Sequence, residues 1–305
     1  MEAIDILIPE HGGKIGAIVA ESLRSHGLRV EVIDDRDVLN DVPGFLRLLK
    51  SSLNKFSPRM VMPVFRSETI ASCRELFPDE VIIPIPDAET LRVLDDKVSA
   101  SMLCIDLGIP QPRCYADNDL DSIADYPVVF KRNQGLSGSG VYFPKNRPAL
   151  DNLVASAKGK PHLVMDYIEG DDFSVDAIRW NGYFHAECYK VLLPKGKGIS
   201  CKRQSVHFPS LVNYVKTILD AMDYRGVCGV DFRIRNDNVN GSKEENSFGE
   251  VFFLECNPRF SGGIKTQIPA GFDIPFILWQ LANGQSPDPV SFIPNLIDSD
   301  LDQED

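Results

Sequence analysis

The stretch VFFLECNPRFSGG, residues 251–263, limits what this chain can fold into more than any other. It begins as an apolar run typical of a buried strand and then turns polar, with Glu255, Asn257 and Arg259 at alternate positions. Pro258 cannot continue a central strand, because it lacks the backbone N–H that the ladder requires. A buried strand therefore ends on a carboxylate, an amide and a guanidinium, and the reason must lie in what faces them.

A second alternating segment, VCGVDFRIR at 227–235, is the expected antiparallel partner of this strand. Side chains two residues apart point to the same side of a strand. The expected apolar face is made of Cys228, Val230, Phe232 and Ile234 with Phe252, Leu254 and Cys256. Phe253, Glu255 and Asn257 are then expected on the opposite face. The two segments together predict a hairpin with one apolar and one polar side.

One register of this hairpin sets Asp231 opposite Glu255 and Gly229 opposite Asn257, whereas shifts of two residues would keep the faces and offset the pairs. Two carboxylates facing each other across a ladder destabilise a sheet. A divalent cation between them removes that penalty, and Mg²⁺ prefers such hard oxygen ligands. The alternative is a solvated sheet face, on which charges are common. Spacing alone leaves both interpretations open.

The first 86 residues predict a small doubly wound α/β domain. Residues 4–8 are typical of a buried strand, followed by a helix that ends at Gly27 and a strand at 28–34, which is a β-α-β unit. Further strands are expected at 56–65 and 80–85, with a short helix near 68–76. The turn after the first strand lacks the full G-x-G-x-x-G pattern, so it is weak support for a dinucleotide site.

Residues 87–295 predict an α+β region whose strands are mostly antiparallel. Asp87 is expected to cap one helix, and a second helix should run from Asp95–Lys97 to Gly108. Strands are expected near 126–131, 139–143, 162–167, 172–179, 183–192, 227–235 and 250–257, and helices at 209–223 and 273–283. The chain thus combines an α/β and an α+β part.

The net charge of −12 includes five acids in the last eight residues, so residues 296–305 are expected to be an acidic, solubilising tail. The negative body argues against nucleic acid or an anionic membrane as the main partner. It does not argue against a phosphate ligand, because local lysines, arginines and Mg²⁺ can hold one.

The seven cysteines are scattered and form no C-x-x-C pair, so neither a disulfide framework nor a zinc site is indicated. The start MEAIDILIPEHGG lacks the basic region of a signal peptide. No apolar run approaches the ~20 residues that cross a bilayer. These features lead us to expect a cytoplasmic protein.

Six motifs in order, over about residues 90–295, resemble the ATP-grasp superfamily. ECNPR at 255–259 is similar to its E-x-N-P-R strand end, and Asp231 in GVDF stands where the family places another metal-binding acid. DDK at 95–97 and YPVVFK at 126–131 resemble the segments that carry its nucleotide-binding lysines. GLSGSG at 135–140 resembles its glycine-rich lid, and LVMDYIEGDDFSVD at 163–176 resembles its adenine hinge followed by G-x-[DE].

The resemblance implies that ATP binds between a lid subdomain at about 110–168 and a C-terminal subdomain at about 169–295. Lys97 and Lys131 would contact phosphates, and Asp172 the ribose hydroxyls. The residues implied to bind the phosphates and the adenine are Gly135, Ser137, Gly138, Ser139, Gly140, Met165, Asp166, Tyr167 and Ile168. The alternative for Lys97 is an exposed helix lysine, and for the glycines a plain hairpin loop.

The same resemblance implies that Asp231, Glu255 and Asn257 hold Mg²⁺ or Mn²⁺, and that Arg259 and Lys131 act on the transferred phosphate. Here Asp stands at 166 and 231 where the family has Glu, so the reach toward nucleotide and metal differs. The substrate contacts expected from basic and acidic residues near the site are Lys190, Arg203, Arg66 and Glu68. Residues 260–269 should line the acceptor side.

The implied reaction is attack of a small-molecule carboxylate on the γ-phosphate of Mg-ATP, followed by displacement of phosphate from the acyl phosphate by an amine, less often a thiol. Such a site needs positioned charge rather than a side-chain nucleophile. Two alternatives stay open: a nucleotide-binding regulatory or interaction module without ligase activity, and an ATP-dependent phosphotransferase. The sequence also leaves a homodimer open.

Overall fold

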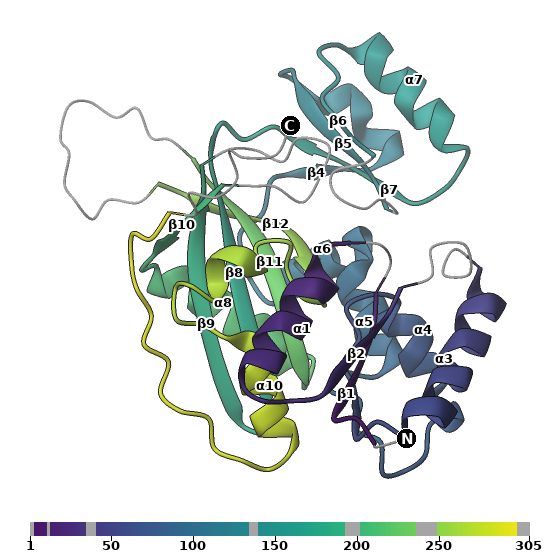
Figure 1. Cartoon of the computed structure of the whole chain (residues 1–305). Coiled ribbons are helices and arrows are strands. Elements are labelled where there is room, and N and C mark those ends of the chain that lie inside the picture. The colour runs from purple at the N-terminus through teal and green to yellow at the C-terminus, as the bar shows by residue number, and fades with distance from the viewer. Residues whose placement is uncertain are drawn as a thin grey trace, which may run out of the picture.

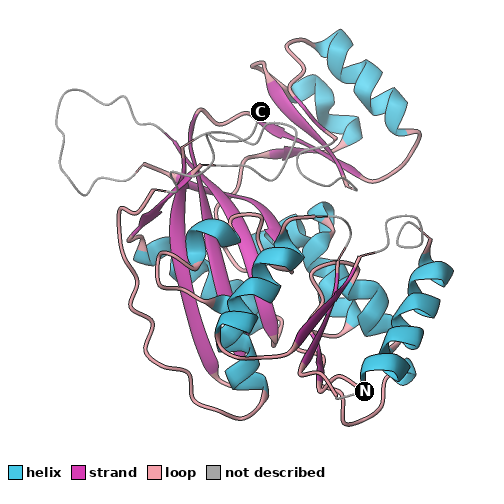
Figure 2. Cartoon of the chain, in the orientation of Figure 1, coloured by secondary structure: helices cyan, strands magenta, loops and turns pink. Residues whose placement is uncertain are grey.

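The computed structural model describes residues 3–10, 13–34, 41–133, 140–192, 202–235 and 249–297. Within these residues the strands form three sheets (Figure 1 and Figure 2). A three-stranded sheet has the order β2-β1-β3, a four-stranded sheet the order β4-β7-β5-β6, and a five-stranded sheet the order β10-β9-β8-β11-β12. The proposed domain limits at residues 86 and 295 stay a prediction.

The first sheet is parallel, as the β-α-β pattern predicts. Its strands are β1 (Ile6–Pro9), β2 (Val30–Ile33) and β3 (Met60–Val61). Helix α1 (Ile15–Ser25) packs with Ile6 and Ile8 in one apolar cluster. Helix α3 (Val42–Phe56) packs with Leu7 in another. Neighbouring side chains of β1 thus enter two different cores, so helices cover both faces of this sheet.

Two expectations for this region were wrong in detail, and one helix was not expected. The strand expected at 80–85 is reduced to a single bridge between Ile82 and Met60. The helix expected at 68–76 is divided into α4 (Ser67–Ser72) and a 3-10 turn, Arg74–Leu76. The sequence analysis also missed α3, although Asp41 caps it by accepting a hydrogen bond from Gly44 N at 2.8 Å. The strand prediction overlooked the prolines around it, which cannot donate to a ladder.

Helices α5 (Ala88–Asp95) and α6 (Lys97–Asp106) follow the predicted limits. Asp87 accepts a hydrogen bond from Thr90 N at 2.9 Å, which confirms its role as an N-cap. Asp96 caps α6 in the same way, through Ser99 N at 2.8 Å. The second cap places Lys97 at the first residue of α6.

The four-stranded sheet stands apart from the rest of the molecule in Figure 1 and is covered by α7 (Arg147–Ala157). Its strands are β4 (Cys114–Tyr115), β5 (Val128–Arg132), β6 (Val141–Tyr142) and β7 (His162–Asp166). The sheet is antiparallel, and Phe130, Leu150 and Val164 lie in its own small core together with a 3-10 turn, Asp117–Ser122. The strand β4 and the helix α7 were not predicted from the sequence.

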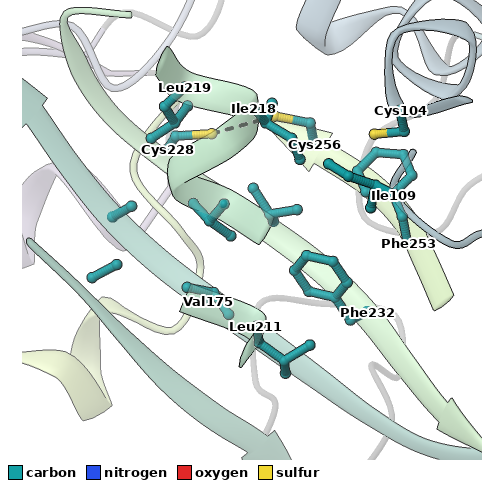
Figure 3. Packing of buried hydrophobic residues seen from close by; sticks show 14 of the residues in the cluster. Cys104, Ile109, Val175, Leu211, Ile218, Leu219, Cys228, Phe232, Phe253 and Cys256 are labelled. Carbon is teal, nitrogen blue, oxygen red and sulfur yellow. Dashed lines mark hydrogen bonds between the residues drawn. The ribbon is translucent and has the colours of Figure 1, made fainter. Parts of the chain in front are cut away.

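The five-stranded sheet is antiparallel and forms the centre of the molecule. Its strands are β8 (Gly170–Trp180), β9 (Tyr183–Val191), β10 (Arg203–Val206), β11 (Gly226–Arg235) and β12 (Val251–Asn257). One face packs against α8 (Pro209–Ala221) and residues of α6, as Figure 3 shows for Leu211, Ile218 and Cys104. Helices α9 (Ile264–Gln267) and α10 (Ile274–Ala282) follow β12.

Among the described cysteines, Cys104, Cys188, Cys228 and Cys256 are buried with free thiols, as expected for small apolar residues. The sulfur atoms of Cys228 and Cys256 lie 3.3 Å apart in the core shown in Figure 3. Among the residues with assigned positions, no helix combines the length and the apolar character that a membrane crossing requires.

Candidate active site

The polar ends of β11 and β12 face each other in one of the registers that the sequence allows. Asp231 lies opposite Glu255, and Gly229 lies opposite Asn257. The Asn257 Nδ2 atom donates a hydrogen bond to Asp231 Oδ2 at 3.4 Å, so the side chains of neighbouring rows approach each other. The arrangement inferred from alternation, an acid pair with an amide beside it on one face, is confirmed.

A β-bulge interrupts the pairing of β12 one residue before Glu255. The register shifts between Asp231 and Phe232, so Phe232 pairs with Phe253, and Leu254 is the extra residue. Phe253 was expected on the polar face, but it lies in the core with its ring centroid 6.2 Å from that of Phe232 (Figure 3). Phe252, expected in that core, instead lies under the Arg235 guanidinium, 4.9 Å from the ring centroid.

Two backbone groups at the bulge bond to residues outside the hairpin. Phe253 N donates to Pro110 O at 2.8 Å. Leu254 O accepts a hydrogen bond from Lys131 Nζ at 3.0 Å. Lys131 belongs to β5 of the four-stranded sheet, so this bond joins that sheet to the strand that carries Glu255.

Both predicted phosphate-binding lysines reach the acid pair. Lys97 Nζ lies 3.9 Å from Glu255 Oε2. Lys131 is only 6% exposed, and this burial lowers its pKa, although the negative charges of Glu255 and Asp231 act in the opposite direction. Cations from α6 and β5 thus converge on carboxylates from β11 and β12. These four elements are separate stretches of the chain.

Arg259 follows the acid pair by four residues and is held close to it. Its backbone N–H donates to Asn257 O at 2.7 Å, and its Nη2 atom donates to Asn257 Oδ1 at 3.0 Å. A small cavity beside the N-terminal sheet is lined by residues that include Arg259, Ser67 and Pro84. The guanidinium therefore borders both the candidate metal ligands and the loop after β3.

The donor set of Asp231, Glu255 and Asn257 suits Mg²⁺ or Mn²⁺, because carboxylate and amide oxygens are the hard ligands these ions prefer. The part of the chain with described positions contains no group of three or more His, Cys, Asp or Glu side chains that could hold a metal ion. Two acids and an amide are an incomplete set for an octahedral ion, so phosphate or water oxygens would have to supply the rest.

The expected adenine hinge is built around an arginine that the sequence analysis did not single out. Arg233 donates to both carboxylate oxygens of Asp172, at 2.7 and 3.0 Å, and to Ile168 O at 3.0 Å. Its guanidinium also lies 5.7 Å from the Tyr167 ring centroid. Burial lowers the pKa of Arg233, but the bond and charge of Asp172 outweigh burial and raise it.

The other two hinge residues lie in β7. Met165 is buried between the neighbouring strands, opposite Val129 of β5 and Cys114 of β4. Asp166 accepts a hydrogen bond from the Tyr115 hydroxyl at 2.6 Å, which together with burial raises the pKa of Tyr115 to about 12. Arg233 lies opposite Asp172 on the neighbouring strand. This contact could be predicted only if the pairing of β8 with β11 were already known.

Comparison with known proteins shows which of them share this architecture. The family described as "ATP-grasp in the biosynthetic pathway with Ter operon" matches residues 158–299, which contain both strands of the acid pair. Biotin carboxylase from Campylobacter jejuni, solved as a β-γ-ATP complex, superposes with a TM-score of 0.76 at 14% identity, covering 96% of this chain and 74% of that one. The chain has the ATP-grasp fold.

Other ATP-grasp proteins are similar over different shares of their length. The ADP complex of N5-carboxyaminoimidazole ribonucleotide synthetase superposes with a TM-score of 0.71 at 13% identity, over 96% of this chain and 80% of that one. The carbamoyl phosphate synthase large chain of Thermomicrobium roseum is 24% identical over 201 residues, which are 57% of this chain. The match spans only 17% of that relative's length, so the similarity carries the fold and not the relative's whole activity.

The ATP-grasp lid motif is only partly visible. Gly135, Ser137, Gly138 and Ser139 lie outside the described residues. Gly140 has φ +89°, and a Cβ there would lie 3.1 Å from Arg132 Cβ, so this position requires glycine on both grounds. Its carbonyl accepts a hydrogen bond from Arg132 N at 2.9 Å, which fixes the end of the motif to β5.

The residues proposed for substrate contact have different surroundings in this ATP-grasp fold. Lys190 Nζ pairs with Asp171 at 2.6 Å, and Glu68 lies 3.8 Å from Arg92, both pairs being partly exposed. Arg66 adopts φ +53° at the start of α4, with its guanidinium over the rings of Phe65 and Phe45 at 5.1 and 5.9 Å.

Arg203 differs from these three residues, because its side chain is only 2% exposed and is ion-paired with Asp176. Its guanidinium is therefore enclosed by protein atoms, and the predicted substrate contact of Arg203 stays a prediction.

Proposed function

We propose that this protein is an ATP-dependent ligase that activates a small-molecule carboxylate as an acyl phosphate and couples it to an amine. The observation that carries the proposal is the convergence of Lys97 and Lys131 on Glu255, opposite Asp231, with Arg259 beside them. Such a site offers fixed charge and oxygen ligands without a nucleophile of its own, which suits transfer of a phosphoryl group between bound molecules.

The two lysines would hold the phosphates of ATP. Lys131 is buried and its pKa is lowered, so in the free protein its ammonium depends on Leu254 O and on the nearby carboxylates for stabilisation. A phosphate oxygen would be a stronger acceptor than a backbone carbonyl, because a hydrogen bond between charged groups exceeds a neutral one. Nucleotide binding would therefore give a stronger hydrogen-bond acceptor to the Lys131 ammonium, which the fold has already removed from water.

Asp231, Glu255 and Asn257 would hold Mg²⁺ or Mn²⁺. When bound there, the ion supplies positive charge to the phosphate oxygens. Glu255 is then shared between Lys97 and the metal, and Asn257 between Arg259 and the metal. This sharing would place the lysines, the metal ligands and the arginine around one triphosphate.

Arg259 would face the phosphoryl group in transit. A substrate carboxylate oxygen attacks the γ-phosphorus, the bond to the β-phosphate oxygen breaks, and ADP leaves. The amine then attacks the acyl carbon, phosphate leaves with the bonding electrons, and the amine loses a proton. In both steps negative charge collects on the transferred group, and a preorganised guanidinium stabilises it.

The acid and amine would enter from the side of the loop after β3. Arg259 and Ser67 line the same small cavity, and Ser67 is the neighbour of Arg66. Arg66 has the left-handed backbone conformation that is uncommon for a non-glycine residue and that accumulates at functional sites. We therefore retain Arg66 as the proposed contact for a substrate carboxylate, with Glu68 and Lys190 as weaker proposals.

The test is incubation of the purified protein with ATP and Mg²⁺, together with pairs drawn from a panel of carboxylic acids and amino acids. We expect ADP and phosphate in equal amounts, released only when a suitable acid is present. Release of AMP and pyrophosphate would contradict the acyl-phosphate route. Mg²⁺-dependent ATP binding by calorimetry without turnover of any acid would instead favour a regulatory module.

A further inference from the structure

Arg203 and Asp176 form a buried ion pair beneath the segment that carries Arg259. Arg203 Nη2 lies 2.9 Å from Asp176 Oδ2, and both side chains are 2% exposed. The guanidinium also stacks over the Tyr189 ring, 4.4 Å from its centroid. Burying two charges is unfavourable unless their contacts are well arranged, so a pair in this place calls for a reason beyond stability.

The pair belongs to the same face of the sheet as the candidate metal ligands. Asp176 lies opposite Gly229, and Gly229 lies opposite Asn257. Since neighbouring strands are about 4.8 Å apart, Asp176 is roughly 10 Å from Asn257 across the sheet. Gly229 separates them without a side chain, and a Cβ there would lie 3.2 Å from Asp176 Oδ1. The missing side chain leaves room for the carboxylate.

The guanidinium of Arg203 is bonded to the loop that follows β12. Its Nη2 atom donates to Gly263 O at 2.6 Å. A Cβ on Gly263 would lie 1.8 Å from Arg203 Cζ, so only glycine allows this approach. Gly263 N in turn donates to Ser261 Oγ at 3.1 Å, which closes the loop on itself.

The loop is therefore fixed at both ends. At its start Arg259 is bonded through its backbone and its guanidinium to Asn257, at 2.7 and 3.0 Å. At its end Gly263 is held by Arg203. Since Arg259 lies four residues before Gly263, a shift of Gly263 is transmitted to it through the short backbone between the two anchors.

We propose that Arg203 is a positioning residue, which is held in place by Asp176 and Tyr189 and fixes segment 258–263 so that Arg259 points at the transferred phosphate. The reference to phosphate rests on the proposed function, whereas the anchoring of the segment does not. Arg203 itself touches neither nucleotide nor substrate in this arrangement. The competing explanation is an ion pair that only supports folding.

The double variant Arg203→Met with Asp176→Leu separates these explanations, because replacing a buried ion pair by apolar residues of similar size often leaves stability unchanged. We expect normal thermal unfolding and an unchanged Kd for Mg-ATP by calorimetry. The kcat for ADP release should fall at least about fiftyfold, the scale expected for a misplaced catalytic group. An unchanged kcat in the folded variant overturns the proposal.

Arg179→Met is the matched control. Arg179 lies on β8 and donates to Asp220 at 3.0 Å, to Asp223 at 3.1 Å and to Tyr224 O at 2.6 Å, all of them outside segment 258–263. Its loss should leave kcat unchanged. A drop in kcat for this control equal to that of the double variant would also overturn the proposal, because any lost arginine contact would then have the same effect.

Gly263→Ala tests the same anchor without removing a charge, and it decides the matter if the double variant does not fold. The added methyl group must displace either the guanidinium or the loop, because the space is already filled. We expect the same loss of kcat with an unchanged Kd for Mg-ATP. Wild-type kcat in Gly263→Ala overturns the proposal.

Hydrogen exchange of the nucleotide-free protein provides a readout that does not depend on ligase activity. Amides within 258–267 should exchange at least about tenfold faster in the variants, with the rest of the five-stranded sheet unchanged, as expected for a local opening. If the wild type turns over no acid, the proposed function fails, but this measurement still decides the anchor. Unchanged exchange in 258–267 overturns it, and faster exchange confined to 258–267 supports it.

Discussion

The two faces of the five-stranded sheet are built from the same strands and yet differ in almost every property. One face carries Val230 and Phe232 into a core shared with α8 and α6. The other face carries Asp231, Asp172 and Asp176, each opposed by or bonded to a charged or polar group. Because side chains alternate along a strand, each core residue is followed by a residue on the charged face. Residues that stabilise the fold and residues proposed to act in the reaction are therefore direct neighbours in the chain.

This difference predicts which property a substitution on each face should change. On the apolar face a side chain contributes by removing carbon from water and filling space, so its loss should affect unfolding. On the charged face the groups stabilise one another only in part, because burial acts against their charges. Their removal should affect ligand binding and turnover far more than folding.

The largest effect is expected for Glu255→Gln on the charged face. The variant loses the carboxylate that pairs with Lys97 and is proposed to bind the metal, so turnover should fall about a thousandfold or more, which corresponds to at least about 4 kcal/mol in transition-state stabilisation. Phosphate release with the best acid of the panel measures this. Glu250→Gln, an exposed acid just before β12, is the control and should be fully active. A folded, active Glu255→Gln protein would remove the metal-ligand assignment.

The next effect belongs to the apolar face. Phe232→Ala should lower the free energy of unfolding by about 3–5 kcal/mol, the usual cost of truncating a buried phenylalanine. The residue is fully buried and lies beside Phe253 and Tyr214. Urea denaturation measures the loss, and turnover of the remaining folded fraction should stay near normal. A cost below about 1 kcal/mol would mean that this face does not hold the sheet together.

Lys131→Met, on the strand β5 that faces the acid pair, should change stability and ligand binding in opposite directions. The substitution removes a buried charge whose pKa burial lowers and replaces it with an apolar chain of similar length. We expect the free energy of unfolding without nucleotide to rise by about 1 kcal/mol, while Mg-ATP affinity is lost. Denaturation and calorimetry measure the two changes, with the exposed Lys145→Met as control. Destabilisation by Lys131→Met would show that the bond to Leu254 O outweighs the burial cost.

The smallest effect is expected at the solvent edge of the charged face. Arg235 pairs with Glu250 at 2.8 Å, and both side chains are largely exposed. Because water screens such pairs, Arg235→Ala should change the free energy of unfolding by about 0.5 kcal/mol or less, as measured by denaturation. A change above about 2 kcal/mol would show that the contact of Arg235 with Phe252 contributes more than the charge pair does.

The sequence was informative wherever a local rule governs the structure. Alternation and the apolar runs predicted that Asp231 and Glu255 share one face, because a slip of one residue would have reversed the buried side. The register that pairs them was one of several that alternation allows, and the structure has it. The cap at Asp87 was equally readable, since it acts on an amide three residues away, whereas the cap at Asp96 was not predicted. The convergence of both lysines on Glu255 was expected only from the family resemblance.

The sequence was uninformative where the cause is distant in the chain. Nothing within FFLE marks the bulge at Leu254, whose backbone partners are Pro110 and Lys131, more than a hundred residues earlier. Arg233 was not singled out and Arg203 was expected only as a substrate contact, because their partners Asp172 and Gly263 lie about sixty residues away. The charge pattern of a strand indicates the face on which a side chain lies. The residue that this side chain contacts across the fold is set by tertiary packing.

The extra residue at Leu254 has a mechanical consequence. A regular strand at the edge of a sheet, as β12 is, bonds only to its one neighbour, but here the chain also bonds to the connection at Pro110 and to the tip of Lys131, immediately before Glu255. Any displacement of the four-stranded sheet relative to the five-stranded one therefore pulls on the residue next to the acid. An irregularity of one residue thus ties the movement of one part of the molecule to the alignment of charge in another.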